Sequence, residues 1–444
     1  MVEHMFEPDV VPDSVLDGRL VETWVSQLAR FAGPLDDRGR VDLLGALERL
    51  TCAAAGLQAD VAAELDDSMR AANEKRRGAQ GAGPEVALAC RESPHRGRRR
   101  VSLGLILRDE MPFTRRALRD GQITSWKATI LARETGCLSL ADRQTVDRRL
   151  AGDPRRVEAM GDGELEGAAR SLAEELDPAA CVLRRRIAES ERHVTLRPAP
   201  DTMSRLCAEL PVASGVAVLK SLADAADVAR AGGDARSRGQ VMTDTLVERV
   251  LGTCGGVVPV EVELVVSDEV LFGTRDDAAY LDGYGPIPAE LARELAKSAG
   301  EAGLARLRRL YRSPDAGQLV AMDSRSRCFD GRLARFVRLR DRICRTPWCG
   351  APIRHTDHAK PVAGDGQTSS RNGQGLCEAC NYAKEAVGWS VTIVGDSPHA
   401  IEIRTPTGQV HRSQAPPLPG HVPRPGGPWG IVPRIDLAFS YPAA

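Results

Sequence analysis

The sequence predicts a mostly α-helical N-terminal region with a small α+β section, followed by a small cysteine-bearing domain near the C-terminus. Three observations lead to this fold class. Aromatic residues make up only 4% of the 444 residues, and long stretches repeat their apolar residues with the period of a helix. Around residue 257 that period changes to the alternation of a strand. Four of the eleven cysteines then stand in two close pairs between residues 344 and 380.

Composition favours a protein of the reducing cytoplasm. The N-terminal stretch MVEHMFEPDVVPDS is acidic and interrupted by proline, which is not the pattern of a signal peptide. No run of about 18 apolar residues occurs, so we expect no membrane contact. Several cysteines, such as Cys52, Cys137 and Cys207, stand singly in helical sequence. This pattern is typical of buried thiols rather than of a disulfide framework.

The N-terminal half reads as a succession of helices. Residues 14–80 show helical periodicity, and a second helical block is predicted from about Val101 to Arg230. Between them, the Gly-, Arg- and Ser-rich stretch from about Arg77 to Arg100 predicts a loop. We interpret its RGRRR segment, residues 96–100, as solvated, although arginines could contact phosphate.

One helix of the second block has clear end signals. The turn at Asp120-Gly121 precedes a helix that we expect Thr124 or Ser125 to cap. Its predicted buried face consists of Ile123, Trp126, Ile130 and Leu131.

The α+β section and the C-terminal elements follow. Alternating valines and glutamates in VVPVEVELVVSDEVLFG predict a strand, and GYGPIP is interpreted as a turn before a further helix. FDGRLARFVRLRDRI predicts an amphipathic helix with a basic face. WSVTIVG and HAIEIRTPTGQVHRS predict two strands, with a turn at Pro406-Thr407-Gly408. The Pro- and Gly-rich tail from about Ala415 is expected to be extended and poorly ordered.

Charge is distributed unevenly along the chain. The formal net charge is -1, but residues 325–388 contain twelve Arg and Lys against six Asp and Glu, a balance of about +6. A basic segment in a near-neutral protein is the pattern expected for a polyanionic partner. Arginine-rich faces are also often merely solvated, so charge alone does not decide between these interpretations.

The four paired cysteines predict a structural zinc site. Four residues separate Cys344 from Cys349, two separate Cys377 from Cys380, and 27 lie between the pairs. Two close pairs can place four thiolates around one ion, a ligand set that favours Zn²⁺, although iron is an alternative. A four-thiolate site has no open position, so this ion would stabilise the fold.

Between the cysteine pairs, the segment HTDHAKP offers groups for phosphodiester hydrolysis. Asp357 supplies a carboxylate for a hard cation, and His358 supplies a base that titrates near neutrality. On a strand the two side chains would point to opposite sides. Asn381, at the start of a predicted helix, could offer an amide oxygen to the same ion. A surface His-Asp hydrogen bond and an asparagine helix cap are the simpler alternatives.

The pattern CRTPWC…HTDHAKP…GDGQTSSRN…LCEACNYAK resembles the cysteine-flanked HNH endonucleases over residues 340–390. The resemblance implies a zinc-braced ββα-metal finger. It assigns His358 as general base, Asp357 as ligand of Mg²⁺ or Mn²⁺, and Asn372 as the asparagine that steadies the loop. Asn381 stands where the family usually has histidine, so the segment resembles an HNN variant. The four cysteines match the family's zinc knuckle.

The preceding region resembles domain of unknown function 222, through RALRDGQITSWKATILARE, VELVVSDEVLFG and GYGPIPAELAREL. This family often precedes an HNH domain, and the resemblance implies architecture without naming catalytic residues. We therefore expect four segments: an N-terminal segment over 1–39, a helical domain over 40–325, an HNH domain over 326–395, and short strands with the tail over 396–444.

These features predict a metal-dependent DNA endonuclease. DNA is the expected partner, with no organic small-molecule cofactor. We expect four basic side chains near the site to contact phosphates: Arg354, Lys360, Arg371 and Lys384. A catalytically degenerate, zinc-stabilised nucleic-acid-binding protein is the main alternative, because of Asn381. A helical scaffold that uses the cysteine domain for recruitment is a third.

Overall fold

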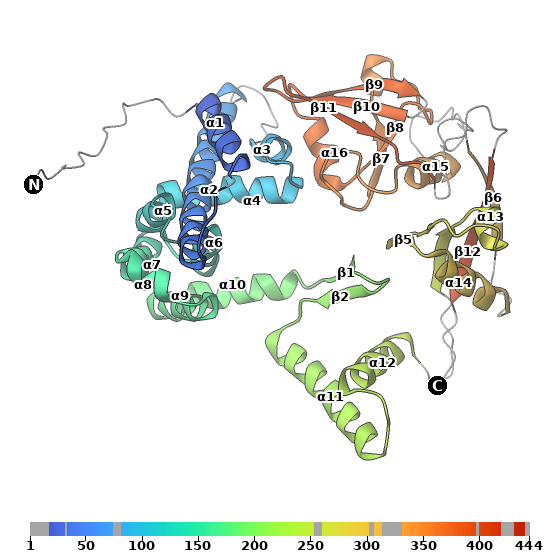
Figure 1. Cartoon of the computed structure of the whole chain (residues 1–444), viewed down its shortest axis with the longest axis horizontal. Coiled ribbons are helices and arrows are strands. Elements are labelled where there is room, and N and C mark those ends of the chain that lie inside the picture. Colours follow the sequence, from blue (N-terminus) through green and yellow to red (C-terminus); the bar gives the residue numbers. More distant parts are fainter. Residues whose placement is uncertain are drawn as a thin grey trace, which may run out of the picture.

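The computed structural model describes residues 17–31, 33–73, 81–252, 260–301, 306–312, 331–396, 399–418 and 430–439. The N-terminal part is helical, as predicted (Figure 1). Its helices are α1 Gly18–Ala29, α2 Asp37–Asn73, α3 Gly83–Ala89, α4 Pro94–Asp109, α5 Pro112–Arg119, α6 Ser125–Glu134, α7 Leu140–Ala151, α8 Pro154–Ala159, α9 Asp162–Leu176 and α10 Pro178–Ser190. None of the helices within the described ranges combines the length and apolar character that a membrane crossing requires.

Helix α6 begins where its sequence signals indicate. The Thr124 side chain accepts a hydrogen bond from the Lys127 amide, which confirms the predicted cap. Ile123, Ile130 and Leu131 lie in the main core of the helical region. Trp126 was wrongly predicted to be buried, because its side chain is 47% exposed. Its ring instead packs beneath the Arg133 guanidinium, whose carbon lies 5.8 Å from the ring centroid.

The predicted loop before residue 101 is helical at residues 83–89 and 94–100, so that prediction is wrong in these two stretches. Ser93 caps α4 by accepting the Arg96 amide at 3.4 Å, and Pro94 occupies the first helical position. The glycines of this stretch permit close helix packing: a Cβ on Gly97 would lie 2.2 Å from the Gly83 carbonyl oxygen. A glycine-rich composition here indicates backbone contact between helices and not a loop. Residues 74–80 lie outside the described residues.

The chain then continues through a β-hairpin and two helices that contact each other to a five-stranded antiparallel sheet. The hairpin pairs β1 Val194–Pro198 with β2 Ser204–Ala208, and the helices are α11 Val212–Ala231 and α12 Arg238–Leu251. The sheet has the order β5-β4-β3-β12-β6. Its strands are β3 Val260–Val265, β4 Ala279–Leu281, β5 Gly285–Ile287, β6 Arg306–Arg312 and β12 Gly430–Phe439, and its helices are α13 Asp268–Leu271 and α14 Ala289–Glu301.

This sheet confirms the strand predicted around residue 260 and corrects the prediction for the tail. Strand β12 lies between β3 and β6, with Phe439 opposite Val260 and Gly430 opposite Arg312. The tail was predicted to be extended and poorly ordered, but its residues 430–439 complete a sheet formed by strands far earlier in the chain. Composition could not predict this pairing, because the partners are distant in sequence.

The C-terminal cysteine-rich unit, residues 331–418, contains two small antiparallel sheets (Figure 1). Strand β7 pairs with β8, while β10 lies between β9 and β11. The sequence predicted two strands after the cysteines, and the structure has three. The elements are α15 Gly331–Asp341, β7 His355–His358, a 3₁₀ turn Val362–Gly364, β8 Gly373–Leu376, α16 Glu378–Lys384, β9 Ser390–Asp396, β10 His399–Arg404 and β11 Val410–Gln414.

A buried contact joins the helical region to the cysteine-rich unit. Glu85 of α3 is 2% exposed and accepts hydrogen bonds from the Thr405 hydroxyl at 2.9 Å and the Thr407 amide at 3.1 Å. The Thr407 hydroxyl donates to the same carboxylate oxygen. Helix α4 also contacts α16. These interactions fix the start of α4 beside the cysteine-rich unit.

Candidate functional site

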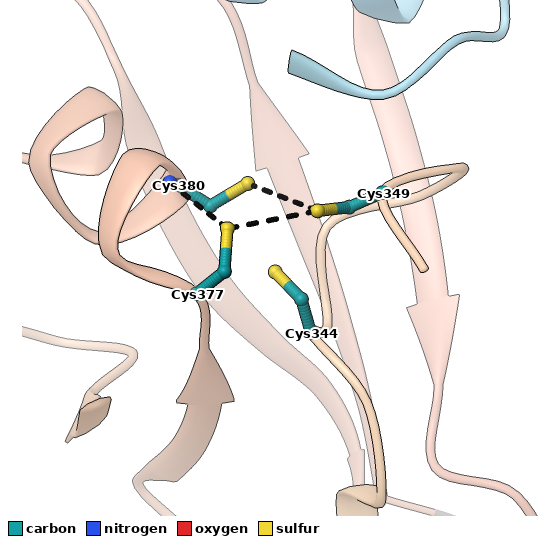
Figure 2. Close-up of side chains that lie close together, drawn as sticks. All are labelled: Cys344, Cys349, Cys377 and Cys380. Atoms are coloured by element: carbon teal, nitrogen blue, oxygen red, sulfur yellow. Dashed lines mark hydrogen bonds between the residues drawn. The ribbon is translucent and has the colours of Figure 1, made fainter. Parts of the chain in front are cut away.

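The four paired cysteines converge on one point, as their spacing predicted (Figure 2). All four are buried, and their sulfur atoms lie within 4.8 Å of one another. The Cys349 sulfur is 3.6 Å from that of Cys377 and 3.7 Å from that of Cys380. Within the described residues, this is the only group of three or more His, Cys, Asp or Glu side chains arranged to hold a metal ion.

Two short backbone turns bring these sulfurs together. After α15, the Cys344 amide donates to the Ala351 carbonyl, and the positive φ angles of Trp348 (58°) and Gly350 (62°) turn the chain on either side of Cys349. Cys377 caps α16, and its sulfur accepts the Cys380 amide at 3.4 Å. Hydrogen bonds from the neighbouring thiols, that of Cys344 first, lower the pKa of Cys377. Four buried cysteine sulfurs around one point fit a zinc ion.

Asp357 and His358 lie at the end of β7, and their side chains lie close to each other. The His358 ring nitrogen Nε2 is 2.9 Å from the Thr368 hydroxyl, which belongs to the loop before β8. Its Nδ1 is 3.7 Å from the Asp357 carboxylate. The same carboxylate accepts the His358 backbone amide at 2.8 Å. The imidazole is therefore held between a carboxylate and a hydroxyl. Thr368 was not singled out from sequence, although it lies within the quoted motif.

Lys384 is directed at Asp357. Its ammonium nitrogen lies 3.0 Å from the carboxylate oxygen Oδ2 and also pairs with Glu385. The side chain is only 8% exposed. Burial lowers the pKa of Lys384, but the hydrogen bonds to Glu385 and Asp357 outweigh that effect and raise it. The contact with phosphate expected for Lys384 stays a prediction, and its present partner is a carboxylate.

Asn372 ties together the loop between β7 and β8. Its Oδ1 accepts the Lys360 amide at 2.8 Å, while Nδ2 donates to the carbonyl oxygens of Lys360 and Gln367, each at 2.9 Å. The residue is 6% exposed. Because this loop carries Thr368, the asparagine side chain holds the hydroxyl that contacts His358.

Asn381 has an unpaired oxygen. It lies in the first turn of α16, and its Oδ1 is buried without a hydrogen-bond partner among the residues that the structure describes. An unpaired buried acceptor is costly and needs a specific reason. An amide oxygen is a ligand that Mg²⁺ and Mn²⁺ accept, so this donor is of the right kind for the predicted ion. The capping position belongs to Cys377 and not to Asn381.

The predicted basic face of α15 is largely engaged inside the molecule. Arg340 is 4% exposed and donates to Asp341, to Ser370 and to Gly373. Arg342 lies 4.7 Å from the Tyr280 ring centroid. The prediction of an exposed basic face is wrong at these positions, since periodicity cannot distinguish a cation facing solvent from one paired in the interior.

Asp341 is the centre of a buried ionic network that sequence reasoning missed. Its carboxylate, 0% exposed, accepts bonds from Arg340 at 2.7 Å and from the Gly375 amide at 2.8 Å, and lies 3.5 Å from Arg345. Arg345 also donates hydrogen bonds to the backbone carbonyl oxygens of His399 and Ser413. The network fastens α15 to β8 and to the three-stranded sheet. The sequence signal that could have indicated this network is Asp341 itself, a single acidic residue at the end of an arginine-rich helix.

Of the remaining basic residues expected at the site, Arg354, Lys360 and Arg371 are exposed. Arg354 lies just before β7, and Lys360 just after it. His355, which shares β7 with Asp357, has its ring centroid 6.3 Å from that of Tyr382. These positions place basic side chains at both ends of β7, while their contact with phosphate stays a prediction.

The structure thus defines a helical protein with a small sheet and a buried four-cysteine cluster. A family model described as "Domain of unknown function (DUF222)" matches residues 40–341. This match spans more than half of the sequence, and the chain belongs to that family. No HNH nuclease family matches the chain. No curated protein and no solved structure matches it either.

Proposed function

We propose that the cysteine-rich unit is an HNH-type, metal-dependent DNA endonuclease centre of ββα-metal architecture, braced by zinc. The observation that carries the proposal is that α16, which bears Asn381, packs against β7 and β8, next to the adjacent Asp357 and His358 at the end of β7. The cysteine cluster joins the end of α15 to the start of α16. Zinc bound there would stabilise the fold, since structural zinc sites contribute folding energy directly.

His358 is the proposed general base. With the proton on Nδ1, beside the Asp357 carboxylate, the lone pair of the ring lies at Nε2, where the Thr368 hydroxyl donates. Nε2 is then the atom that would accept a proton from water, after the water replaces the Thr368 hydroxyl at this single lone pair. The Asp357 carboxylate stabilises the imidazolium that results. Asn372 supports the reaction by holding the Thr368 loop.

Asp357 and Asn381 are the proposed ligands of the catalytic ion. A divalent cation bound there would supply positive charge for the phosphorane transition state and the leaving oxygen. Two features of these residues support the assignment: the carboxylate lies beside the base, and the Asn381 oxygen is unpaired. Oxygen donors favour Mg²⁺ or Mn²⁺ over softer ions. Exposed Arg354, with Lys360, would bind the phosphate backbone without reading sequence.

A second candidate function is DNA binding without cleavage. The observation in its favour is the Lys384 ammonium, which lies 3.0 Å from the Asp357 carboxylate and competes there with a metal ion. Asn381, standing where histidine is usual in the family that the segment resembles, weakens the ion site further. In this alternative the cysteine-rich unit binds the phosphate backbone but does not activate water.

Plasmid cleavage by the purified chain with Mg²⁺ or Mn²⁺ tests the two candidates. We expect metal-dependent nicking that His358→Ala abolishes while duplex binding persists. His193→Ala is the matched control, because His193 is half exposed and lies outside the cysteine-rich unit. No cleavage with either ion by a zinc-loaded, DNA-binding chain would reject the nuclease and favour the second candidate. Equal loss of cleavage in the control variant would reject His358 as the base.

A further inference from the structure

Helix α4 packs against the protein through backbone and leaves its first turns open on the other side. A Cβ on Gly97 would lie 2.2 Å from the Gly83 carbonyl oxygen, and one on Gly104 would lie 2.1 Å from the Ala59 carbonyl oxygen. The face of α4 that carries Gly97 and Gly104 therefore has no room for larger side chains. The first turns and the turn before them carry a group of exposed arginines, which we name the α4 arginine cluster: Arg91, Arg96, Arg98 and Arg99.

The arginines of the α4 arginine cluster differ from their neighbours in their lack of a carboxylate partner within the described ranges. Neighbouring Arg100 pairs with Glu92 at 2.8 Å, and Arg108, further along α4, pairs with Asp67 and Asp109. Across the ranges that the structure describes, no carboxylate pairs with any member of the cluster. Several guanidinium groups at short spacing and without counter-charges produce a positive potential that favours an anionic partner.

The cluster is held beside the proposed nuclease centre. Glu92 and Pro94, at the start of α4, line one cavity together with Lys384 and Trp389 of the cysteine-rich unit. Lys384 in turn contacts Asp357. Figure 1 shows α3 and α4 on the side of the helical region that faces α16. The Glu85 hydrogen bonds to the β10–β11 turn fix this arrangement.

We propose that the α4 arginine cluster binds the phosphate backbone of duplex DNA and extends the DNA-binding surface of the nuclease centre onto the helical domain. This inference rests on the proposed function. The planar guanidinium group matches phosphate oxygens in a bidentate fork. From Pro94 to Arg99 the helix rises roughly 8 Å, which corresponds to about two or three phosphates of one strand. Such contacts position the duplex and do not read its sequence.

The test is duplex binding by full-length chains, measured by fluorescence anisotropy with a labelled 30-base-pair DNA over a salt series. All chains carry His358→Ala so that the probe stays intact. We expect the triple variant Arg96→Gln/Arg98→Gln/Arg99→Gln to bind at least about 10-fold more weakly near 0.1 M salt. The slope of log K against log salt concentration should become shallower by about 2 to 3. The corresponding triple lysine variant, which keeps the charge, should retain most of the affinity.

A matched control separates a local contact from general loss of charge. Arg148, Arg155 and Arg156 are also exposed and have no carboxylate partner within the described ranges, but α7 and α8 lie on the side away from the cysteine-rich unit (Figure 1). Replacing these three by glutamine should change the affinity less than about twofold. Circular dichroism melts check that each variant folds.

The outcomes distinguish this inference from the proposed function. If the α4 triple binds DNA as its parent does, or if the control triple weakens binding equally, the inference is overturned even where the wild-type chain cleaves plasmid. A parent chain that binds no duplex overturns it as well. A loss of duplex affinity in the α4 triple variant but not in the control triple supports the inference. This holds even if the wild-type chain never cleaves DNA, because only the nuclease assignment fails in that case.

Discussion

Replacing Asn372 by alanine should open the loop between β7 and β8. The side chain makes three hydrogen bonds, at 2.8, 2.9 and 2.9 Å, to backbone groups of Lys360 and Gln367. Each contributes about 1 kcal/mol net, so their loss should lower the free energy of local opening by about 3 kcal/mol. Because every 1.4 kcal/mol is tenfold in an equilibrium constant, exchange of the loop amides should accelerate on the order of 100-fold.

Hydrogen exchange measured by mass spectrometry suits this prediction, since it reports local opening within a chain of several parts. The peptide that contains Ala359 is the one to follow, because its amide donates to the Asn372 carbonyl at 2.7 Å. Asn381→Ala is the matched control: its Oδ1 has no partner, so its removal should leave exchange in the loop within about threefold of wild type.

Two results would refute this reasoning. Exchange in Asn372→Ala within threefold of wild type would mean that the three bonds do not hold the loop. Equal acceleration in Asn381→Ala would mean that the unit responds to any asparagine loss. If the loop opens as expected, His358 loses the fixed position of Thr368, and cleavage should fall in Asn372→Ala at unchanged DNA affinity.

Three further predictions concern the rest of the unit. Asp341→Ala should destabilise it by about 3 to 5 kcal/mol, because Arg340 and Arg345 would remain buried without a counter-charge; urea-dependent proteolysis of the unit at wild-type rates would contradict this. Burial, followed by the charge of Arg340, lowers the pKa of His399 to about 4, so protonation favours the unfolded state below pH 6.5, and stability should fall by about 2 kcal/mol between pH 7 and pH 5. His399→Gln should remove that part of the pH dependence, as measured by unfolding at both pH values. Cys377→Ser should lose the bound zinc and the exchange protection of α16 together, and a variant with full metal content by atomic absorption would rule out the four-sulfur site.

The features predicted correctly from sequence are those that local pattern determines. The four cysteines converge because close pairs in two short turns have few other ways to pack. Thr124 caps α6 because a hydroxyl before an apolar period satisfies the first free amides. The strand beginning at Val260 follows from alternation. The position of β12 beside this strand could not be predicted from alternation, because the two strands are separated by about 170 residues of chain.

Errors of another kind arose where one residue type serves two environments. Glycines between Arg77 and Arg100 were interpreted as loop residues, yet Gly97 is helical and allows α4 to pack against the backbone of α3. Helical propensity counts against glycine in isolation, and the compensating contact lies in other helices. A sequence pattern does not contain that contact, so the loop prediction failed where the packing is closest.

The arginines of α15 have a consequence for where DNA would bind. The balance of about +6 over residues 325–388, a segment that includes α15, was the pattern expected for a polyanionic partner. Arg340, Arg342 and Arg345 are instead engaged with Asp341, with Tyr280 and with backbone carbonyls, so part of that charge stabilises the fold. The cations of this unit that stay exposed include Arg338, Arg354, Lys360 and Arg371, and non-specific affinity grows with each phosphate neutralised. We propose that α4 adds basic side chains of the helical domain to those that this unit already exposes.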